Sequence, residues 1–278
     1  MKKLLNLIKN EISLILTLIL LVSIGLIFWF SSSKTEDFGL NFFTEMLGVV
    51  VTVLIIDRLI RKREESKNIP QKLAVYEDVR LYTSRYISFW TTTFRETVPE
   101  PDPTSIKDFF SDNGMTKILS NLHMDAEPNV FPARKWWDWI IQNAKEFKDR
   151  GDKILDRHSN NLEPIVFGHI HQLTESTFNN FLLNINAIRQ SDQATNFPRV
   201  KVLASYSMKP PQEDFDAILG LIDWCEKSYT ILKKYNKSIL KVSEYNPIKD
   251  KKMPPKSMIP ELVLNQQIEA QEQHRQKK

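Results

Sequence analysis

The residues best suited to metal chemistry are two histidines, His169 and His171, in the segment VFGHIHQ. Apolar residues recur around them at helical spacing, so we expect a helix over residues 163–188. Side chains two residues apart on a helix point to nearly opposite sides and cannot bind the same ion. The sequence therefore predicts no metal site at this pair and no cofactor elsewhere.

The same segment resembles the GHxH block of metallophosphoesterases, and Gly151 to Arg157 resembles their GDxxDR block with one residue too many. The third block of that family, GNH, has no counterpart in this chain. The two blocks also follow each other closely on expected helices instead of lying across a β-sandwich. The resemblance therefore extends neither to the fold nor to the activity of that family.

A second group of chemical interest is a row of carboxylates on a helix that we expect to begin at Pro132. Glu146, Asp149, Asp152 and Asp156 share part of one helical face, as magnesium ligands would. Basic residues alternate with them, namely Lys145, Lys148, Arg150, Lys153 and Arg157. This alternation is typical of a solvent-exposed face with ion pairs. Because the chain also lacks a glycine-rich phosphate loop and a nucleophile motif, the sequence predicts a protein that is not an enzyme.

The composition favours helices. Cys225 is the only cysteine among 278 residues, which excludes an intramolecular disulfide and a cysteine-based zinc site. We expect it to be a small buried residue on a helix. Only 7 residues are glycine, which is too few for a protein rich in tight turns between strands. The sequence therefore predicts an all-α fold.

Two long apolar segments, 12–30 and 38–60, occupy the N-terminal part of the chain. The first has 19 residues and no charge, and at about 1.5 Å per residue such a helix spans a hydrocarbon core of about 30 Å. The residues that follow it, SSSKTED, offer no signal-peptidase site. We therefore expect an uncleaved transmembrane hairpin over residues 1–64.

Basic residues flank this hairpin at the end opposite its loop: Lys2, Lys3, Lys9, Arg58, Arg61, Lys62 and Arg63. The connecting residues 31–37 carry one Lys, one Glu and one Asp. Because positive charges accumulate on the cytoplasmic side of membrane proteins, both basic ends should lie inside. The sequence predicts a multi-pass membrane protein with both termini cytoplasmic.

The second apolar segment has a stripe of polar and small residues, which we call the polar stripe: Asn41, Glu45, Gly48 and Thr52. Spacings of four, three and four place them on one helical face, and Thr44 adds a small-xxx-small pattern beside it. A carboxylate in a bilayer must meet protein or water. In one interpretation the stripe packs against residues of the first segment, namely Ser13, Thr17 and Gly25. In the other, copies of the chain assemble through it and Glu45 lines a conductive path.

Residues 65–258 should form a cytosolic helical bundle, followed by a polar tail over 259–278. Apolar periodicity and proline positions predict helices over 70–97, 105–122 with a break at Asn113-Gly114, 132–155, 163–188 and 212–244, and a short extended piece over 200–204. The tail is expected to fray. Residues 233–278 hold eleven basic and five acidic residues; solubility is favoured as their role over binding to anionic lipid or nucleic acid.

The segment FFTEMLGVVVTVLIIDRLIRKREE, residues 42–65, is joined to a helical part without a catalytic motif. This arrangement resembles the two-transmembrane effectors of retron antiphage systems. The resemblance implies a toxin-like protein of the bacterial inner membrane that a reverse transcriptase and its RNA–DNA product keep inactive. Released when a phage interferes with host DNA processing, such an effector disrupts the inner membrane and causes abortive infection.

An alternative is a non-toxic membrane-anchored scaffold or sensor whose helical domain binds a partner. The expected partners are the lipid bilayer, further copies of the chain and, by resemblance only, the reverse transcriptase with its RNA–DNA product. Growth and membrane potential after induction separate the two functions.

Overall fold

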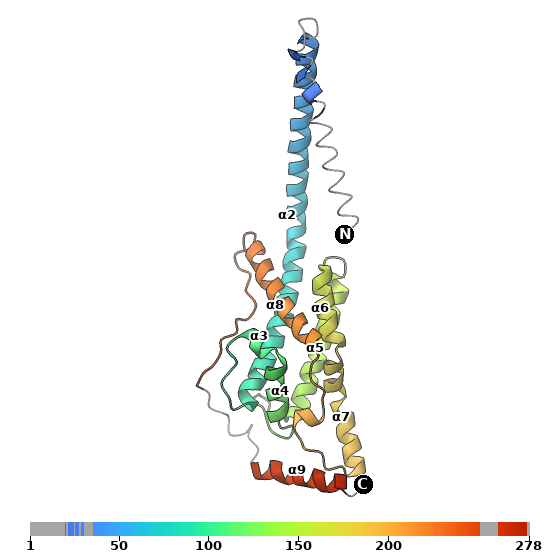
Figure 1. The fold of residues 1–278 in the computed structure, drawn as a ribbon, viewed down its shortest axis with the longest axis vertical. Helices are drawn as coiled ribbons and strands as arrows, with labels where there is room; N and C mark the ends of the chain where they lie inside the picture. Colours follow the sequence, from blue (N-terminus) through green and yellow to red (C-terminus); the bar gives the residue numbers. More distant parts are fainter. Residues whose placement is uncertain are drawn as a thin grey trace. The chain divides into compact units, whose positions relative to one another are not determined.

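The computed structural model describes residues 20, 22–24, 26–27, 29–30, 36–250 and 261–276. Over these residues the regular elements are α-helices, one short 3₁₀-helix and a single isolated β-bridge (Figure 1). The predicted all-α fold is confirmed at this level. The chain divides into two compact units, Met1–Ile69 and Pro70–Lys278, which we describe separately.

Helix α2 runs from Glu36 to Thr97 and belongs to both units. The sequence predicts a helix that begins at Pro70, and this start is wrong because Pro70 lies inside α2. A proline removes one backbone hydrogen bond, but the Lys, Arg, Glu and Gln residues on both sides of it are strong helix formers. The helix propensity of the flanking residues therefore outweighs the tendency of a proline to mark the start of a helix.

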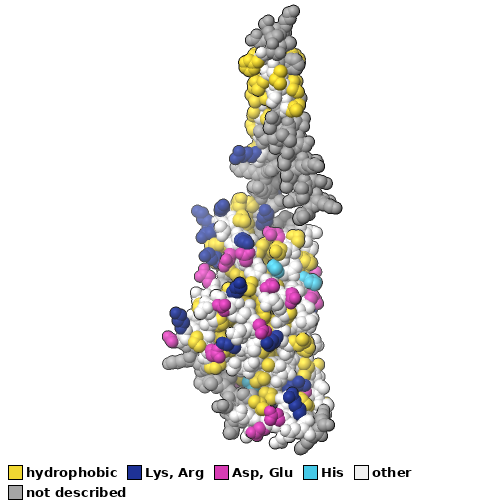
Figure 2. Space-filling view, in the orientation of Figure 1, with side chains coloured by type: hydrophobic (Ala, Val, Ile, Leu, Met, Phe, Trp, Pro, Cys, Tyr) yellow, Lys and Arg dark blue, Asp and Glu magenta, His cyan; other side chains and the backbone are white. Residues whose placement is uncertain are grey.

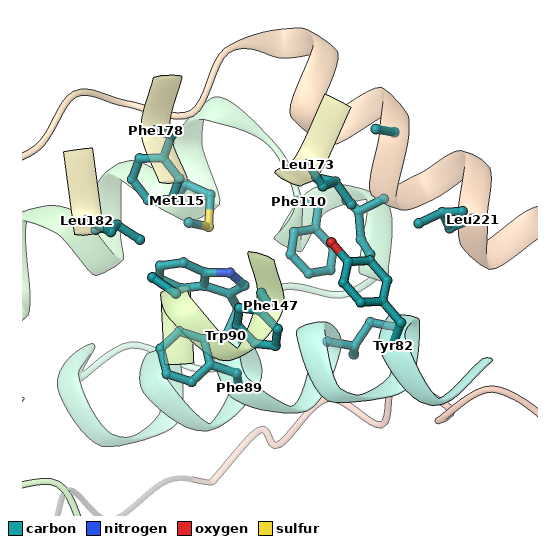
Figure 3. Packing of buried hydrophobic residues seen from close by; sticks show 14 of the residues in the cluster. Tyr82, Phe89, Trp90, Phe110, Met115, Phe147, Leu173, Phe178, Leu182 and Leu221 are labelled. Carbon is teal, nitrogen blue, oxygen red and sulfur yellow. The ribbon is translucent and has the colours of Figure 1, made fainter. Parts of the chain in front are cut away.

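The second unit has an aromatic core around the second half of α2. Trp90 is 1% exposed and its ring centroid lies 5.7 Å from that of Phe178 on α7 (Thr177–Thr195). Phe89 contacts Phe147 of α5 (Trp136–His158) at 5.5 Å. Figure 3 shows the indole of Trp90 surrounded by these rings and by Leu182. The apolar side of α2 thus organises the other helices of this unit.

Two glycines allow helices of the second unit to pack closely. A Cβ atom on Gly151 of α5 would collide with the Thr174 methyl group on α6 (Pro164–Glu175). A Cβ atom on Gly220 of α8 (Gln212–Leu232) would collide with the imidazole of His169. Helix α6 therefore lies between α5 and α8, with a glycine at each crossing.

The predicted helix over 105–122 is two helices, α3 (Ile106–Phe109) and α4 (Asp112–Asn121). The predicted break at Asn113-Gly114 is wrong, since the chain breaks at Phe110-Ser111. The Ser111 hydroxyl accepts a hydrogen bond from the Gly114 N–H at 3.3 Å and so caps α4. Gly114 is instead needed inside the helix, because a Cβ atom there would collide with the carbonyl oxygen of Phe109.

The next helix, α5, begins at Trp136, and the predicted start at Pro132 is wrong. The N–H of Trp136 donates to the Ala126 carbonyl at 3.0 Å, and that of Trp137 donates to Met124 at 3.3 Å. The first amides of α5 are therefore satisfied by a preceding loop and not by a side-chain cap.

The predicted helix over 163–188 is divided into α6 and α7 at Ser176. The hydroxyl of Ser176 accepts from the Asn179 N–H at 3.0 Å, which makes it the N-cap of α7. The apolar periodicity continues across this break, because both helices bury the same side of the chain. Sequence periodicity alone therefore does not reveal it.

The last predicted helix, 212–244, ends twelve residues early, at Leu232, as α8. Ile239 and Val242 continue the apolar spacing and are buried, but they lie in irregular chain. The extended piece predicted over 200–204 contains one antiparallel bridge, His123 to Val202, followed by η1 (Leu203–Ser205). The tail, which was predicted to fray, contains α9 (Glu261–Gln276).

Candidate membrane-packing surface

Among the described residues one helix is long and apolar enough to cross a bilayer, the Asp37–Ile60 part of α2. Only 6% of its most apolar window is buried within the protein. In Figure 2, hydrophobic side chains make up most of the coloured surface of this stretch. A core helix of a soluble protein would bury such side chains, so their exposure favours lipid as the surrounding medium.

The polar stripe lies on one face of this helix. At 100° per residue, Asn41, Glu45, Gly48 and Thr52 fall within about 60° of one another. All four residues are exposed. A Cβ atom built on Gly48 would meet nothing within 4 Å. The stripe therefore forms a shallow polar surface that no described part of the chain covers.

The opposite face of the same helix, about 150° away, is the covered one. It comprises the less exposed residues of the segment, namely Gly39, Phe42, Phe43, Met46 and Val50. The ring of Trp29, from the first apolar segment, lies 5.8 Å from that of Phe43. At this point the first segment thus contacts the face that faces away from the polar stripe.

This arrangement bears on the two interpretations of the stripe. Ser13, Thr17 and Gly25, the proposed intramolecular partners, lie outside the described residues. The contact that is described, Trp29 with Phe43, leaves the stripe open. The hydroxyl of Thr44 is already satisfied within α2, because it donates to the carbonyls of Leu40 and Asn41 at 3.0 and 2.9 Å.

The basic anchors are described only in part. Arg58 and Arg63 are exposed on α2. The side chains of Arg61 and Lys62, and the whole of Lys2, Lys3 and Lys9, lie outside the described residues. The predicted membrane orientation therefore stays a prediction.

The two histidines of the segment VFGHIHQ lie in different surroundings. His169 packs against Gly220, and burial lowers the pKa of its imidazole. His171 is exposed and stacks on Phe167 with ring centroids 6.2 Å apart. Within the described ranges no group of three or more His, Cys, Asp or Glu side chains is placed to hold a metal ion. The two imidazoles thus lie in different surroundings, as their spacing predicts.

The acidic face of α5 is an ion-paired surface, as predicted. Glu146 contacts Arg150 at 2.7 Å and Arg85 of α2 at 2.5 Å. Lys148 contacts Asp152 at 3.8 Å. The predicted burial of Cys225 is also confirmed, and burial raises the pKa of its thiol to about 12, which removes its nucleophilic character.

A cavity of about 540 Å³ lies between the end of α7, η1 and α9. Two of its cations are paired, Arg199 with Asp192 and Lys201 with Asp125, each at 2.7 Å. The third, Arg189, lies 4.8 Å above the Trp137 ring. Sequence reasoning missed this cavity, because its residues come from distant segments without a motif.

Helix α9 is held over this cavity by glutamines. The Gln267 side chain accepts from the Lys201 N–H at 3.2 Å, and that of Gln271 accepts from the Val200 N–H at 3.4 Å. Apolar periodicity does not reveal either hydrogen bond. This is why the sequence predicts a polar tail that frays and not a helix at this position.

Comparison of the chain with protein-family models, with curated proteins and with solved structures finds no match.

Proposed function

We propose that this chain is an effector of a retron-type antiphage system that disrupts the bacterial inner membrane. Residues 37–60 of α2 and the first apolar segment insert as a hairpin, with both termini in the cytoplasm. A reverse transcriptase and its RNA–DNA product keep the chain inactive until infection releases it. The retron context rests on the resemblance over residues 42–65, and the membrane-damaging step rests on the geometry of α2.

The observation that carries the membrane step is the exposure of the polar stripe on the face opposite Phe43. A carboxylate near the centre of a bilayer costs about 2.5–3.5 kcal/mol. Assembly of several chains through their stripes removes Glu45 and Asn41 from lipid. Gly48, with open space beside it, lets the helix backbones approach closely. In such an assembly the carboxylates converge on a hydrated path that lets ions cross.

The second unit fits a regulatory role better than a catalytic one. Its described side chains hold no metal cluster, and its only thiol is buried with a raised pKa. The proposal therefore assigns signal reception to this unit and membrane damage to the hairpin, without an enzymatic step.

The test follows membrane potential with a voltage-sensitive dye in bacteria that express the full chain. The wild-type chain should depolarise the cells and stop growth. Glu45→Leu and Thr52→Leu should each abolish depolarisation while the chain remains in the membrane fraction at unchanged abundance. Val51→Leu, which changes an exposed apolar residue outside the stripe, is the matched control and should depolarise as the wild type does.

Depolarisation that persists in both stripe variants would contradict the proposed pore surface. A wild-type chain that leaves the potential intact but copurifies with a partner would instead show the scaffold function. If a reverse transcriptase is encoded beside the gene, as the proposal requires, its co-expression with its RNA–DNA product should suppress depolarisation. Depolarisation that is unaffected by this co-expression, or the lack of such a neighbouring gene, would contradict the retron context.

A further inference from the structure

The segment after α8 presents an unusual surface, which we call the lysine surface. Residues 228–243 contain four Lys and neither Asp nor Glu. The lysine surface consists of the following exposed side chains: Ile231, Lys233, Lys234, Tyr235, Lys237 and Leu240. The three apolar members, Ile231, Tyr235 and Leu240, are 59%, 55% and 63% exposed. Cationic and apolar groups thus alternate on chain that is not helical after Leu232.

The backbone below this surface is fixed. Leu232, Ile239 and Val242 are buried in the core. The Tyr76 hydroxyl of α2 donates to the Leu240 carbonyl at 2.6 Å, and the Ser243 N–H donates to the Ser84 hydroxyl at 3.0 Å. These contacts hold the segment against α2, so its exposed side chains point outward from a rigid base.

The positive charge of this surface is not neutralised by neighbouring carboxylates. Within the described part of the chain, Lys233, Lys234 and Lys237 form no ion pair with an Asp or Glu. The ammonium group of Lys233 lies 5.3 Å from the Tyr229 ring centroid. Lys241, which is not part of the lysine surface, contacts Glu244 just beyond this segment at 3.5 Å. Three cations therefore remain available to an external anion.

The lysine surface lies at the end of the second unit where α2 enters it. The contact of Tyr76 with Leu240 fixes this position, because Tyr76 lies in the first turns of α2 within this unit. Figure 1 shows the last turn of α8 at this end and the last turn of α7 at the other. Along the sequence, residues 61–69 connect the apolar stretch that ends at Ile60 to Pro70, the first residue of this unit.

We propose that the lysine surface binds the anionic headgroups of the membrane into which α2 inserts. Lysines hold their ammonium groups among lipid phosphates, while Ile231, Leu240 and the amphipathic ring of Tyr235 enter the interface. A nucleic-acid backbone would use the lysines but would leave the exposed aliphatic groups in water, and a single tyrosine is a poor stacking platform. This interpretation replaces solubility as the role of these residues.

The inference rests on the membrane insertion contained in the proposed function, but not on pore formation. Docking of the second unit onto anionic lipid would hold it at the bilayer surface.

The experiment uses the full chain in nanodiscs of phosphatidylcholine alone or with phosphatidylglycerol. Ser238→Cys, an exposed position beside Lys237, carries an environment-sensitive fluorophore, and the buried Cys225 stays unlabelled. The emission of the label should shift to shorter wavelength, and spin-labelled lipid should quench it, only in discs that contain phosphatidylglycerol. Lys→Gln changes at 233, 234 and 237 should each lower the ratio of docked to undocked protein about fivefold, and their combination more than about 100-fold. A label at Ser191→Cys, on the last turns of α7, is the matched control and should not respond.

Equal emission in neutral and anionic discs would overturn the inference, and so would an equal response of the Ser191→Cys label. A label that responds to short single-stranded DNA but not to phosphatidylglycerol would show a nucleic-acid surface and also overturn it. Chain that alkaline carbonate extracts from membranes would refute insertion and with it the proposed function. Chain that resists extraction but shows no lipid-dependent emission refutes the lysine surface alone. Glu45→Leu should leave docking unchanged.

Discussion

Helix α2 places two very different surfaces on one continuous backbone. In its first half, over residues 37–60, the apolar side chains are exposed, and Leu59 is 61% exposed. In its second half, Tyr76, Val79 and Phe94 are completely buried. The helix geometry is the same, but the first half is apolar on most of its circumference whereas the second half has one apolar side. The distribution of apolar residues around the axis therefore decides whether lipid or protein is the expected surrounding.

Threonine hydroxyls donate to carbonyls of α2 in both halves, as Thr44 does in the first, but the halves differ in the polar groups that they leave exposed. In the second half, Thr83, Thr91 and Thr93 are buried and donate to carbonyls one turn earlier, at 2.8 to 2.9 Å. In the first half, the carboxylate of Glu45 is exposed on a helix surrounded by apolar side chains. A polar group that the chain satisfies by itself is structural, while one left exposed in an apolar surface is available for association.

The largest expected effect tests whether the second half of α2 organises the core. Trp90→Ala removes an indole that is 1% exposed and should lower the free energy of unfolding of the second unit by about 3–5 kcal/mol. Leu59→Ala, in the exposed half, should change it by less than about 0.5 kcal/mol. Chemical denaturation of the full chain in detergent, followed by circular dichroism, measures both. Similar losses of unfolding free energy in the two variants would contradict the division of α2 into an exposed first half and a second half that organises the core.

A second comparison uses one glycine from each unit. In Gly114→Ala the new Cβ meets the backbone carbonyl of Phe109, which cannot move without disturbing α3, so we expect a loss of about 1–3 kcal/mol. Gly48→Ala places its Cβ in open space and should not destabilise the chain. Denaturation midpoints of the two variants measure the difference. Equal midpoints would show that α3 and α4 adapt.

The sequence predicts the all-α class, the second apolar helix and most helix locations because these depend on local periodicity and composition. It fails at helix ends. The end of α8 at Leu232 cannot be found by periodicity, since Ile239 and Val242 keep the apolar spacing in irregular chain. The break at Ser176 depends on one hydroxyl, which caps α7 by accepting from the Asn179 N–H, and the apolar periodicity that continues through it does not reveal the cap.

The candidate surface was predictable as a set of residues but not as an exposed face. Spacing places Asn41 and Thr52 on one side of the helix. Only the contact of Trp29 with Phe43 shows which side the first segment meets. The lysine surface could not be predicted for another reason. Its three lysines are visible in the sequence, but their position beside Tyr76 depends on a contact between residues far apart in the chain.

A smaller effect is expected for the hydrogen bond that attaches the lysine surface to α2. Tyr76→Phe removes the donor to the Leu240 carbonyl and should lower the free energy of unfolding by about 1 kcal/mol. It should also increase amide hydrogen exchange over residues 233–243, measured by mass spectrometry, while exchange in residues 37–60 is unchanged. Unchanged exchange over 233–243 would show that Leu232, Ile239 and Val242 alone hold this segment.

A buried carboxylate of the second unit offers a comparison with Glu45. Asp214 is 2% exposed, and burial raises its pKa even though it accepts a hydrogen bond from Gln172 at 2.9 Å. Because the folded pKa lies above the unfolded one, the carboxyl favours folding below the unfolded pKa, and this contribution is lost as the pH rises through the folded pKa. The Asp214→Asn variant should therefore exceed the wild type in free energy of unfolding most at pH 7 and least near pH 4. Denaturation of both proteins across this range measures this difference, and a difference that does not change with pH would contradict a raised pKa.

The smallest effect is expected on the charged side of the second half of α2. Arg85 contacts Glu146 at 2.5 Å, but their side chains are 47% and 39% exposed, so water and salt screen the pair. Glu146 also keeps Arg150 as a partner. Arg85→Ala should therefore change the free energy of unfolding by less than about 0.5 kcal/mol, as measured by denaturation at low and high salt. A larger, salt-sensitive loss would mean that this face, and not the aromatic core alone, holds α5 against α2.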